Sequence, residues 1–173
     1  MGLFDELSRM PALLSRVAEV FPEAAVRARS GSFALVEHVW HLADLEREGF
    51  GARIARLLAE TDPWLPDFDG ERTARERRYL QLDLAEGVAA FAAARAANMK
   101  TLRGVDAGQW SRPGRQEGVG AVLLSELPRR MREHDLAHLG EITDLLFELA
   151  PEHPMIAGLR ALAQGGPPNP QAA

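Results

Sequence analysis

The chain has 173 residues, which suits one domain with its own hydrophobic core. Its 20 Lys and Arg against 25 Asp and Glu give a net charge of −5, which argues against the basic face that nucleic-acid binding requires. The sequence contains no cysteine, so a disulfide framework, a thiolate metal site and a cysteine nucleophile are all excluded.

Neither a targeting segment nor a membrane span is visible. The N-terminal stretch MGLFDELSRM is acidic and lacks the apolar core of a signal peptide. No apolar run approaches the roughly 20 residues that a membrane-spanning helix needs. We therefore expect a cytoplasmic protein that binds neither a membrane nor a nucleic acid.

Apolar residues recur at helical spacing from the start of the chain, whereas strand signals are nearly absent. A first helix is outlined from Phe4 to Phe21, and Pro11 either kinks it or resets its start. Ser30 or Ser32 can cap a second helix, because an apolar stripe runs from Phe33 to Leu57.

The second half of the chain begins with a long connection. TDPWLPDFDGE at 61–71 is rich in proline and aspartate, which predicts a loop long enough to cross from one end of a bundle to the other. A third helix is marked from Leu84 to Leu102, although Arg95 interrupts its apolar stripe. Residues 104–120 are Gly-rich and irregular, and a fourth helix then runs to about Leu149.

Four amphipathic helices with short and long connections predict an all-α protein, a four-helix bundle over residues 1–150 with a long crossover after helix two. Residues 151–173 are expected to form a short helix and a flexible tail, with His153 exposed. A homodimer is also expected, with GSFALVEHVW at 31–40 or the apolar face of the third helix as the pairing surface.

The fourth helix carries two histidines on its inward stripe. This stripe steps by three and four residues through Leu124, Leu127, Met131, His134, His138, Ile142, Leu145 and Leu149. Residues i and i+4 share a helix face, so the two imidazoles point the same way. Burying both without partners costs desolvation twice, whereas one metal ion accepts a lone pair from each. The pair therefore favours a metal site, which we expect near one end of the bundle core, over two hydrogen-bonded core histidines.

A metal site needs a third ligand from another helix, and the second helix offers His38 and His41. Periodicity alone does not choose between them, because a polar strip runs beside the apolar one on this helix. Glu37 and Asp44 on the same helix could orient the ligand imidazoles as hydrogen-bond acceptors, or could form salt bridges with Arg47 and its neighbours.

HLADLE at 41–46, followed by HDLAH at 134–138, resembles the DinB/YfiT-like family of metal-dependent enzymes. In that family a histidine of the second helix joins the two histidines of an H-x-x-x-H motif in the fourth. The resemblance covers most of residues 1–150 and leaves His38 as a neighbour of the site. It implies three metal ligands: His41, His134 and His138. It also implies a four-helix bundle that holds a divalent metal ion, commonly nickel or zinc.

Three imidazoles leave a coordination position open, as in catalytic sites. The resemblance implies a small thiol such as mycothiol, bacillithiol or glutathione as co-substrate, so we expect a metal-dependent transferase that uses a low-molecular-weight thiol. A metal-dependent hydrolase using bound water and a non-catalytic metal-binding protein are the alternatives. Asp135 lies where the H-E-x-x-H motif has its general base, so it could be catalytic; the alternative is that it faces solvent or an arginine, since it is rotated about 100° from His134.

Overall fold

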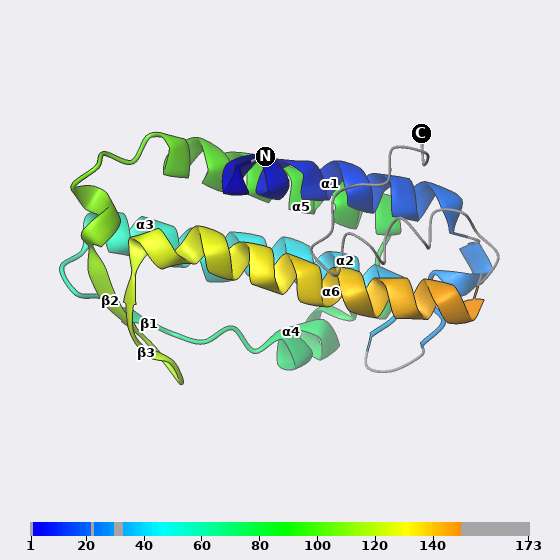
Figure 1. Ribbon diagram of the computed structural model, residues 1–173. Coiled ribbons are helices and arrows are strands. Elements are labelled where there is room, and N and C mark those ends of the chain that lie inside the picture. Colours follow the sequence, from blue (N-terminus) through cyan, green and yellow to red (C-terminus); the bar gives the residue numbers. More distant parts are fainter. Residues whose placement is uncertain (1, 22, 30–32, 150–173) are drawn as a thin grey trace.

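The computed structural model describes residues 2–21, 23–29 and 33–149. Within these ranges, long helical rods lie side by side and form the predicted bundle (Figure 1). The rods are α1 (Leu3–Val20), α2 (Leu35–Asp44) continued by a π-helical stretch (Leu45–Gly51) and α3 (Ala52–Ala59), α5 (Leu84–Arg103), and α6 (Leu127–Leu149). The expected C-terminal helix and His153 lie outside the described residues.

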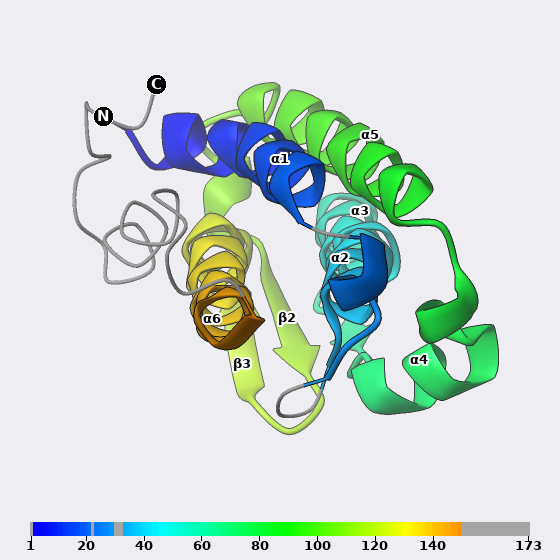
Figure 2. The same ribbon diagram turned by 90° about the vertical axis from the view of Figure 1, so that its right-hand side faces the viewer.

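The arrangement of the rods is clear in the end-on view of Figure 2, where α1 lies between α5 and α6. The α2–α3 rod also contacts both α5 and α6. Because α2–α3 and α5 run in the same direction, the chain between them returns along the bundle (Figure 1). This confirms the predicted crossover after the second helix. The returning segment carries a short outer helix, α4 (Gly70–Arg77), and a 3₁₀ turn (Tyr79–Gln81).

A small sheet at one end of the bundle departs from the purely helical prediction (Figure 1). β1 (Trp64–Leu65) pairs in parallel with β2 (Pro113–Gln116), which pairs antiparallel with β3 (Gly120–Leu123). β1 falls in the segment expected to be a loop, and β2 in the segment expected to be irregular. Strands of two to four residues are too short to produce a recognisable alternation of apolar and polar residues.

Two apolar clusters fill the core. One joins α1, α2 and the C-terminal half of α6, while the other joins α3, the sheet and the start of α6. Along α6, Met131 belongs to the second cluster and Leu139 to the first, so the histidine turns lie between them. Along α5, Arg95 lies in the same way between Phe91 and Met99. The expected position of the histidines near one end of the core is therefore wrong, since they belong to a polar layer at mid-length.

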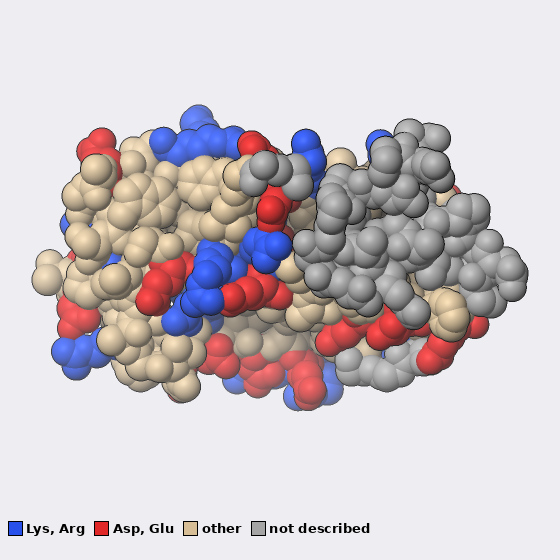
Figure 3. All heavy atoms as spheres, viewed as in Figure 1, with Lys and Arg blue, Asp and Glu red and all other residues tan. Residues whose placement is uncertain are grey.

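On the face seen in Figure 3, acidic and basic side chains are intermingled and form no continuous basic field. No helix of the described ranges is both long and apolar enough to cross a membrane.

One expected pairing surface is largely buried within the chain itself, although Phe33 and Trp40 stay partly exposed. The apolar side chains of Ala34, Leu35, Val36 and Val39 are buried inside the monomer. The segment 31–40 is thus used for the protein's own core as far as it is described, and pairing through α5 stays a prediction.

Candidate metal centre

Three histidines that are far apart in the sequence converge in the polar layer. His41 of α2 meets His134 and His138 of α6, with one ligand nitrogen of each within 4.8 Å of the others. The Nε2 atoms of His41 and His134 are 3.3 Å apart. Two nitrogens bound to one tetrahedral ion by bonds of about 2.0–2.1 Å would lie about 3.3–3.4 Å apart. This pair therefore already has the spacing of two metal ligands.

Burial keeps these imidazoles neutral. It is the main cause that lowers the pKa of His41 to about 4, of His134 to about 3 and of His138 to about 2, and neighbouring imidazoles lower the last two further. A neutral imidazole offers one lone pair, which is what a transition metal binds. The donor set, its spacing and its protonation state all fit a divalent ion.

His38 and Glu141 lie behind His138. The Nδ1 atoms of His38 and His138 are 2.9 Å apart, and an oxygen of Glu141 lies 3.4 Å from Nδ1 of His138 and 3.5 Å from that of His38. The possible ligand atoms of His38, His138 and Glu141 also lie close enough together to hold a metal ion. However, one proton shared between the two Nδ1 atoms satisfies both imidazoles without a metal. Because Nδ1 of His138 faces His38 and Glu141, Nε2 of His138 is the nitrogen that remains to bind a metal ion beside His41. Glu141 was not predicted, although its position three residues after His138 on one helix face is visible in the sequence.

His41 is held in place by packing. Its Nδ1 is buried and has no hydrogen-bond partner among the described residues. The rings of Phe33 and Phe68 lie 5.6 and 5.9 Å from its imidazole. Gly70, the first residue of α4, approaches so closely that a Cβ there would lie 2.5 Å from Nδ1. Only a residue without a side chain fits at this point.

The two carboxylates considered as partners for the ligands are engaged by arginines. Asp44 pairs with Arg47 at 2.7 Å and with Arg77 at 2.5 Å. Glu37 accepts hydrogen bonds from Arg29. Neither carboxylate hydrogen-bonds an imidazole among the described residues, so the salt-bridge alternative is the one observed. Both carboxylates are nevertheless buried, which the sequence alone did not indicate.

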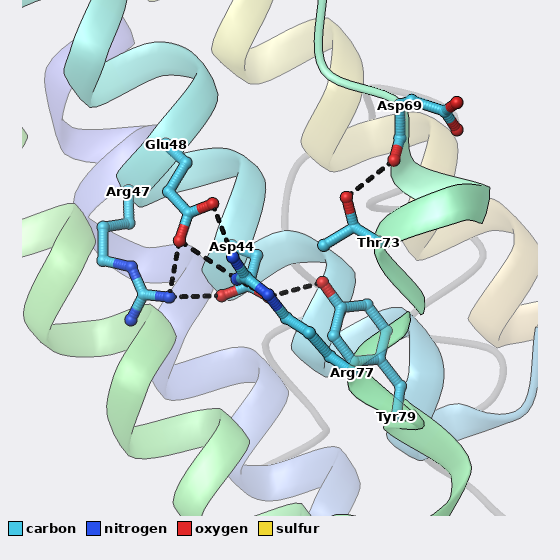
Figure 4. A network of polar contacts seen from close by, with 7 residues as sticks. All are labelled: Asp44, Arg47, Glu48, Asp69, Thr73, Arg77 and Tyr79. Atoms are coloured by element: carbon cyan, nitrogen blue, oxygen red, sulfur yellow. Dashed lines mark hydrogen bonds and ion pairs between the residues drawn. The ribbon is translucent and has the colours of Figure 1, made fainter. Parts of the chain in front are cut away.

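The Asp44 network fastens α4 to the bundle (Figure 4). Arg77 reaches from α4 to Asp44 and, at 2.8 Å, to Glu48 of the π-helical stretch. Tyr79, just beyond α4, donates its hydroxyl to Asp44 at 2.5 Å. These contacts position the N-terminus of α4, and with it Gly70, against the His41 ring.

The carboxylate of Asp135 is bound by an arginine of α5. Its two oxygens accept hydrogen bonds from Arg95 at 2.7 and 2.8 Å, and Arg95 also donates to Glu46 at 2.9 Å. Burial raises the pKa of Asp135 to about 6, although Arg95 acts against this shift. Arg95, which interrupts the apolar stripe of the third helix, is thus a buried partner for Asp135. A catalytic role for Asp135 stays a prediction, since no hydrogen bond joins it to an imidazole in the described part of the chain.

Comparison with known proteins agrees with this architecture. YfiT from Bacillus subtilis, described as a probable metal-dependent hydrolase with an unusual four-helix bundle topology, matches with a TM-score of 0.78. The two chains are 20% identical over 85% of each, a likeness that establishes the fold. No curated protein gave a significant match. The family model of the DinB superfamily matches residues 6–142, and the chain therefore belongs to the DinB superfamily.

Proposed function

We propose that this protein is a metal-dependent transferase that uses a low-molecular-weight thiol as nucleophile. One observation carries the proposal: three neutral imidazoles, one buried and two partly buried, present their ligand nitrogens within 4.8 Å of one another. Imidazole sites bind nickel, copper and zinc more tightly than manganese, so nickel or zinc is the proposed ion. Three protein ligands leave a position for a substrate group.

The protein residues around this position have separable roles. His41, His134 and His138 bind the ion, while His38 and Glu141 hold the proton on the far nitrogen of His138 and so fix its tautomer. When bound, the ion would lower the pKa of a coordinated thiol, about 8.5 when free, so that it reacts as a thiolate at neutral pH.

The placement of the carboxylates favours a thiol over water as nucleophile. Asp135 is occupied by Arg95, and Glu141 lies at the rear nitrogen of His138. Neither is therefore placed as a base beside the open position. A thiol needs no such base, because coordination alone is sufficient to deprotonate it. The absence of cysteine further means that a sulfur nucleophile must come from a co-substrate.

Hydrolysis is the second candidate, since YfiT, which shares this fold, is described as a probable metal-dependent hydrolase. Such a reaction would use the same three ligands to bind and orient a water molecule. Asp135 would then have to leave Arg95 to accept a proton, which makes it the residue that distinguishes the two reactions.

Turnover of a model electrophile tests the proposal. Protein loaded with nickel or zinc is offered the electrophile with mycothiol, bacillithiol, glutathione or no thiol. Turnover that requires a thiol and is abolished in His41→Ala supports the transferase. Metal-dependent turnover that ignores every thiol but is lost in Asp135→Asn favours the hydrolase. A protein that binds metal stoichiometrically yet turns over nothing is a metal-binding protein, and both enzymatic proposals then fail.

A further inference from the structure

Two arginines lie beside the metal centre and take no part in it. Arg130 is four residues before His134 on α6 and so shares its helix face, about 6 Å away along the axis. Arg53 of α3 packs over the ring of Phe50 at 5.8 Å, and the edge of the same ring meets His134 at 6.1 Å.

The two guanidinium groups are near each other and buried to different degrees. The side chain of Arg53 is buried, with 6% exposed, whereas that of Arg130 is partly exposed. Burial is the main reason why the pKa of Arg53 lies below its ordinary value, and the charge of Arg130 lowers it further. Two like charges close together in a desolvated place are unfavourable unless an anion compensates them.

The protein compensates these two charges only weakly. Arg53 makes long contacts with the carbonyl of Pro66 at 3.3 Å and with the exposed Asp67 at 3.5 Å. Arg130 reaches Gln116 and Glu126 at 3.4 Å each. The Nε atoms of both arginines are buried and have no hydrogen-bond partner among the described residues. Donors thus remain on both side chains.

Arg95 gives the internal comparison. Its Nε is also unpartnered, but its two terminal nitrogens make bonds of 2.7–3.0 Å to Asp135, Glu46 and the carbonyl of Leu7. Arg95 is therefore a neutralised structural cation. Arg53 and Arg130 make no short bonds of this kind to the described residues, which separates them from an arginine that serves the fold alone.

We propose that Arg53 and Arg130 form a recognition site for an oxyanion group, a carboxylate or a phosphate, on the molecule that enters the metal centre. Guanidinium groups bind such oxyanions through paired, charge-assisted hydrogen bonds. Arg130 is one helical turn before His134 on α6, so the oxyanion group would lie beside the metal centre and not on the ion itself. The inference deepens the proposed function, on which its kinetic part rests: the substrate class becomes anionic thiols or anionic electrophiles.

Anion binding without turnover tests the site independently of the reaction. Calorimetric titrations use succinate and inorganic phosphate as probes, with neutral succinamide as control. They are carried out on the metal-loaded protein and on His41→Ala, so that anions binding to the ion itself are recognised. Binding of succinate or phosphate in both proteins, with no binding of succinamide, supports the site. Failure of both anions to bind in either protein overturns it, whatever the enzyme does.

A matched pair of variants locates the binding. Arg130→Gln should weaken anion binding by about tenfold to a hundredfold, because it removes charge-assisted hydrogen bonds. Arg129→Gln removes the same charge from the next residue of α6, which is exposed and paired with Glu133, and should leave binding unchanged. Equal weakening by both variants would mean general surface attraction and would overturn the proposal.

A measurement on the unmodified protein covers the case in which Arg130→Gln does not fold. Nitrogen-15 NMR detects the Nε–H groups of Arg53 and Arg130, and both signals should shift when phosphate or succinate is added. Signals that stay unchanged at saturating anion overturn the proposal.

Kinetics then identify which substrate carries the anion. Glutathione is compared with its diethyl ester, and a carboxylate electrophile with its methyl ester. If the thiol is recognised, Arg130→Gln should raise KM for glutathione at least tenfold and leave KM for the ester unchanged. If the electrophile is recognised, the same contrast should appear between the acid and its ester. An equal effect on charged and neutral forms of both substrates would contradict the assignment.

Discussion

Gly70 is the residue whose replacement most directly tests how the metal centre is built. It begins α4, in the crossover segment, and is 29 positions from His41 in the sequence. A Cβ at this position would lie 2.3 Å from Cε1 and 2.5 Å from Nδ1 of His41. Since non-bonded carbon atoms rest about 3.5–4.0 Å apart, Gly70→Ala requires a movement of about 1 Å or more.

Either the imidazole or α4 must make this movement. The α4 helix is fastened by Arg77, which bonds both Asp44 and Glu48, whereas His41 has no hydrogen bond on Nδ1 within the described ranges. We therefore expect the ring to yield. Metal–ligand distances vary by only about 0.2 Å around their ideal values. The displaced His41 ring can therefore no longer bind an ion that His134 and His138 hold. The expected effect is a loss of metal affinity of about tenfold to a hundredfold, with an overpacking cost of about 1–3 kcal/mol in the free energy of unfolding.

Competition titration with a chromophoric chelator measures the affinity, and urea unfolding of the metal-free protein measures the stability. Gly140→Ala is the matched control, because Gly140 lies in α6 close to His138 and a Cβ there meets nothing within 4 Å. This control should keep its metal affinity and gain up to about 1 kcal/mol in helix stability. Adding Arg77→Ala to Gly70→Ala should restore part of the affinity by letting α4 retreat. Unchanged metal affinity in Gly70→Ala alone would refute the idea that α4 holds His41 in place.

Three further predictions follow from the buried polar groups. His41→Ala should abolish stoichiometric metal binding, whereas His38→Ala should weaken it by about 10–100-fold; equilibrium dialysis showing the reverse order would mean that the wrong histidine of α2 was chosen. Arg95→Met should cost about 3–5 kcal/mol in denaturant unfolding because it leaves buried carboxylates unpaired. Arg56→Met, which opens an exposed pair, should have a far smaller effect on the free energy of unfolding. In the metal-free protein, burial lowers the pKa of all four described imidazoles. Their contribution to the free energy of unfolding is therefore complete above pH 6.5. It is lost as the pH falls toward 4, by about 1.4 kcal/mol per pH unit for each histidine. Asp135, with its pKa raised to about 6, acts in the opposite sense and offsets one histidine; unfolding free energies that do not change between pH 7 and pH 5 would contradict the neutral cluster.

Helical periodicity predicts the rods and the paired histidines because both are local features. His134 and His138 share a face of α6 by spacing alone, and the structure keeps them on it. His38 and His41 cannot be separated in this way, since both are buried on α2 and both face α6. Their roles differ only through which part of α6 each one meets, which no pattern within the second helix contains.

The features that the sequence did not reveal depend on contacts between distant segments. Arg95 looks like a defect in an apolar stripe until Asp135, 40 residues later, is placed opposite it. Gly70 looks like one more loop residue until α4 is folded back onto His41. The sheet joins strands of two to four residues from two separate segments, so neither segment carries a pattern of its own.

The polar layer explains how one bundle can hold a reactive centre in its interior. A buried imidazole or carboxylate is costly, and placing several at one level of a bundle would be unfavourable if they had to stabilise the fold. Here apolar clusters on both sides of the layer supply the core, and short bonds neutralise Arg95, Asp135 and Glu46 within it. The unsatisfied groups that remain are at His41, Arg53 and Arg130, apart from one nitrogen of Arg95. His41 lies against His134, Arg53 packs over the Phe50 ring that meets His134, and Arg130 is one turn before it on α6. The unused bonding capacity of the described core therefore lies near the proposed sites of the ion and the anion.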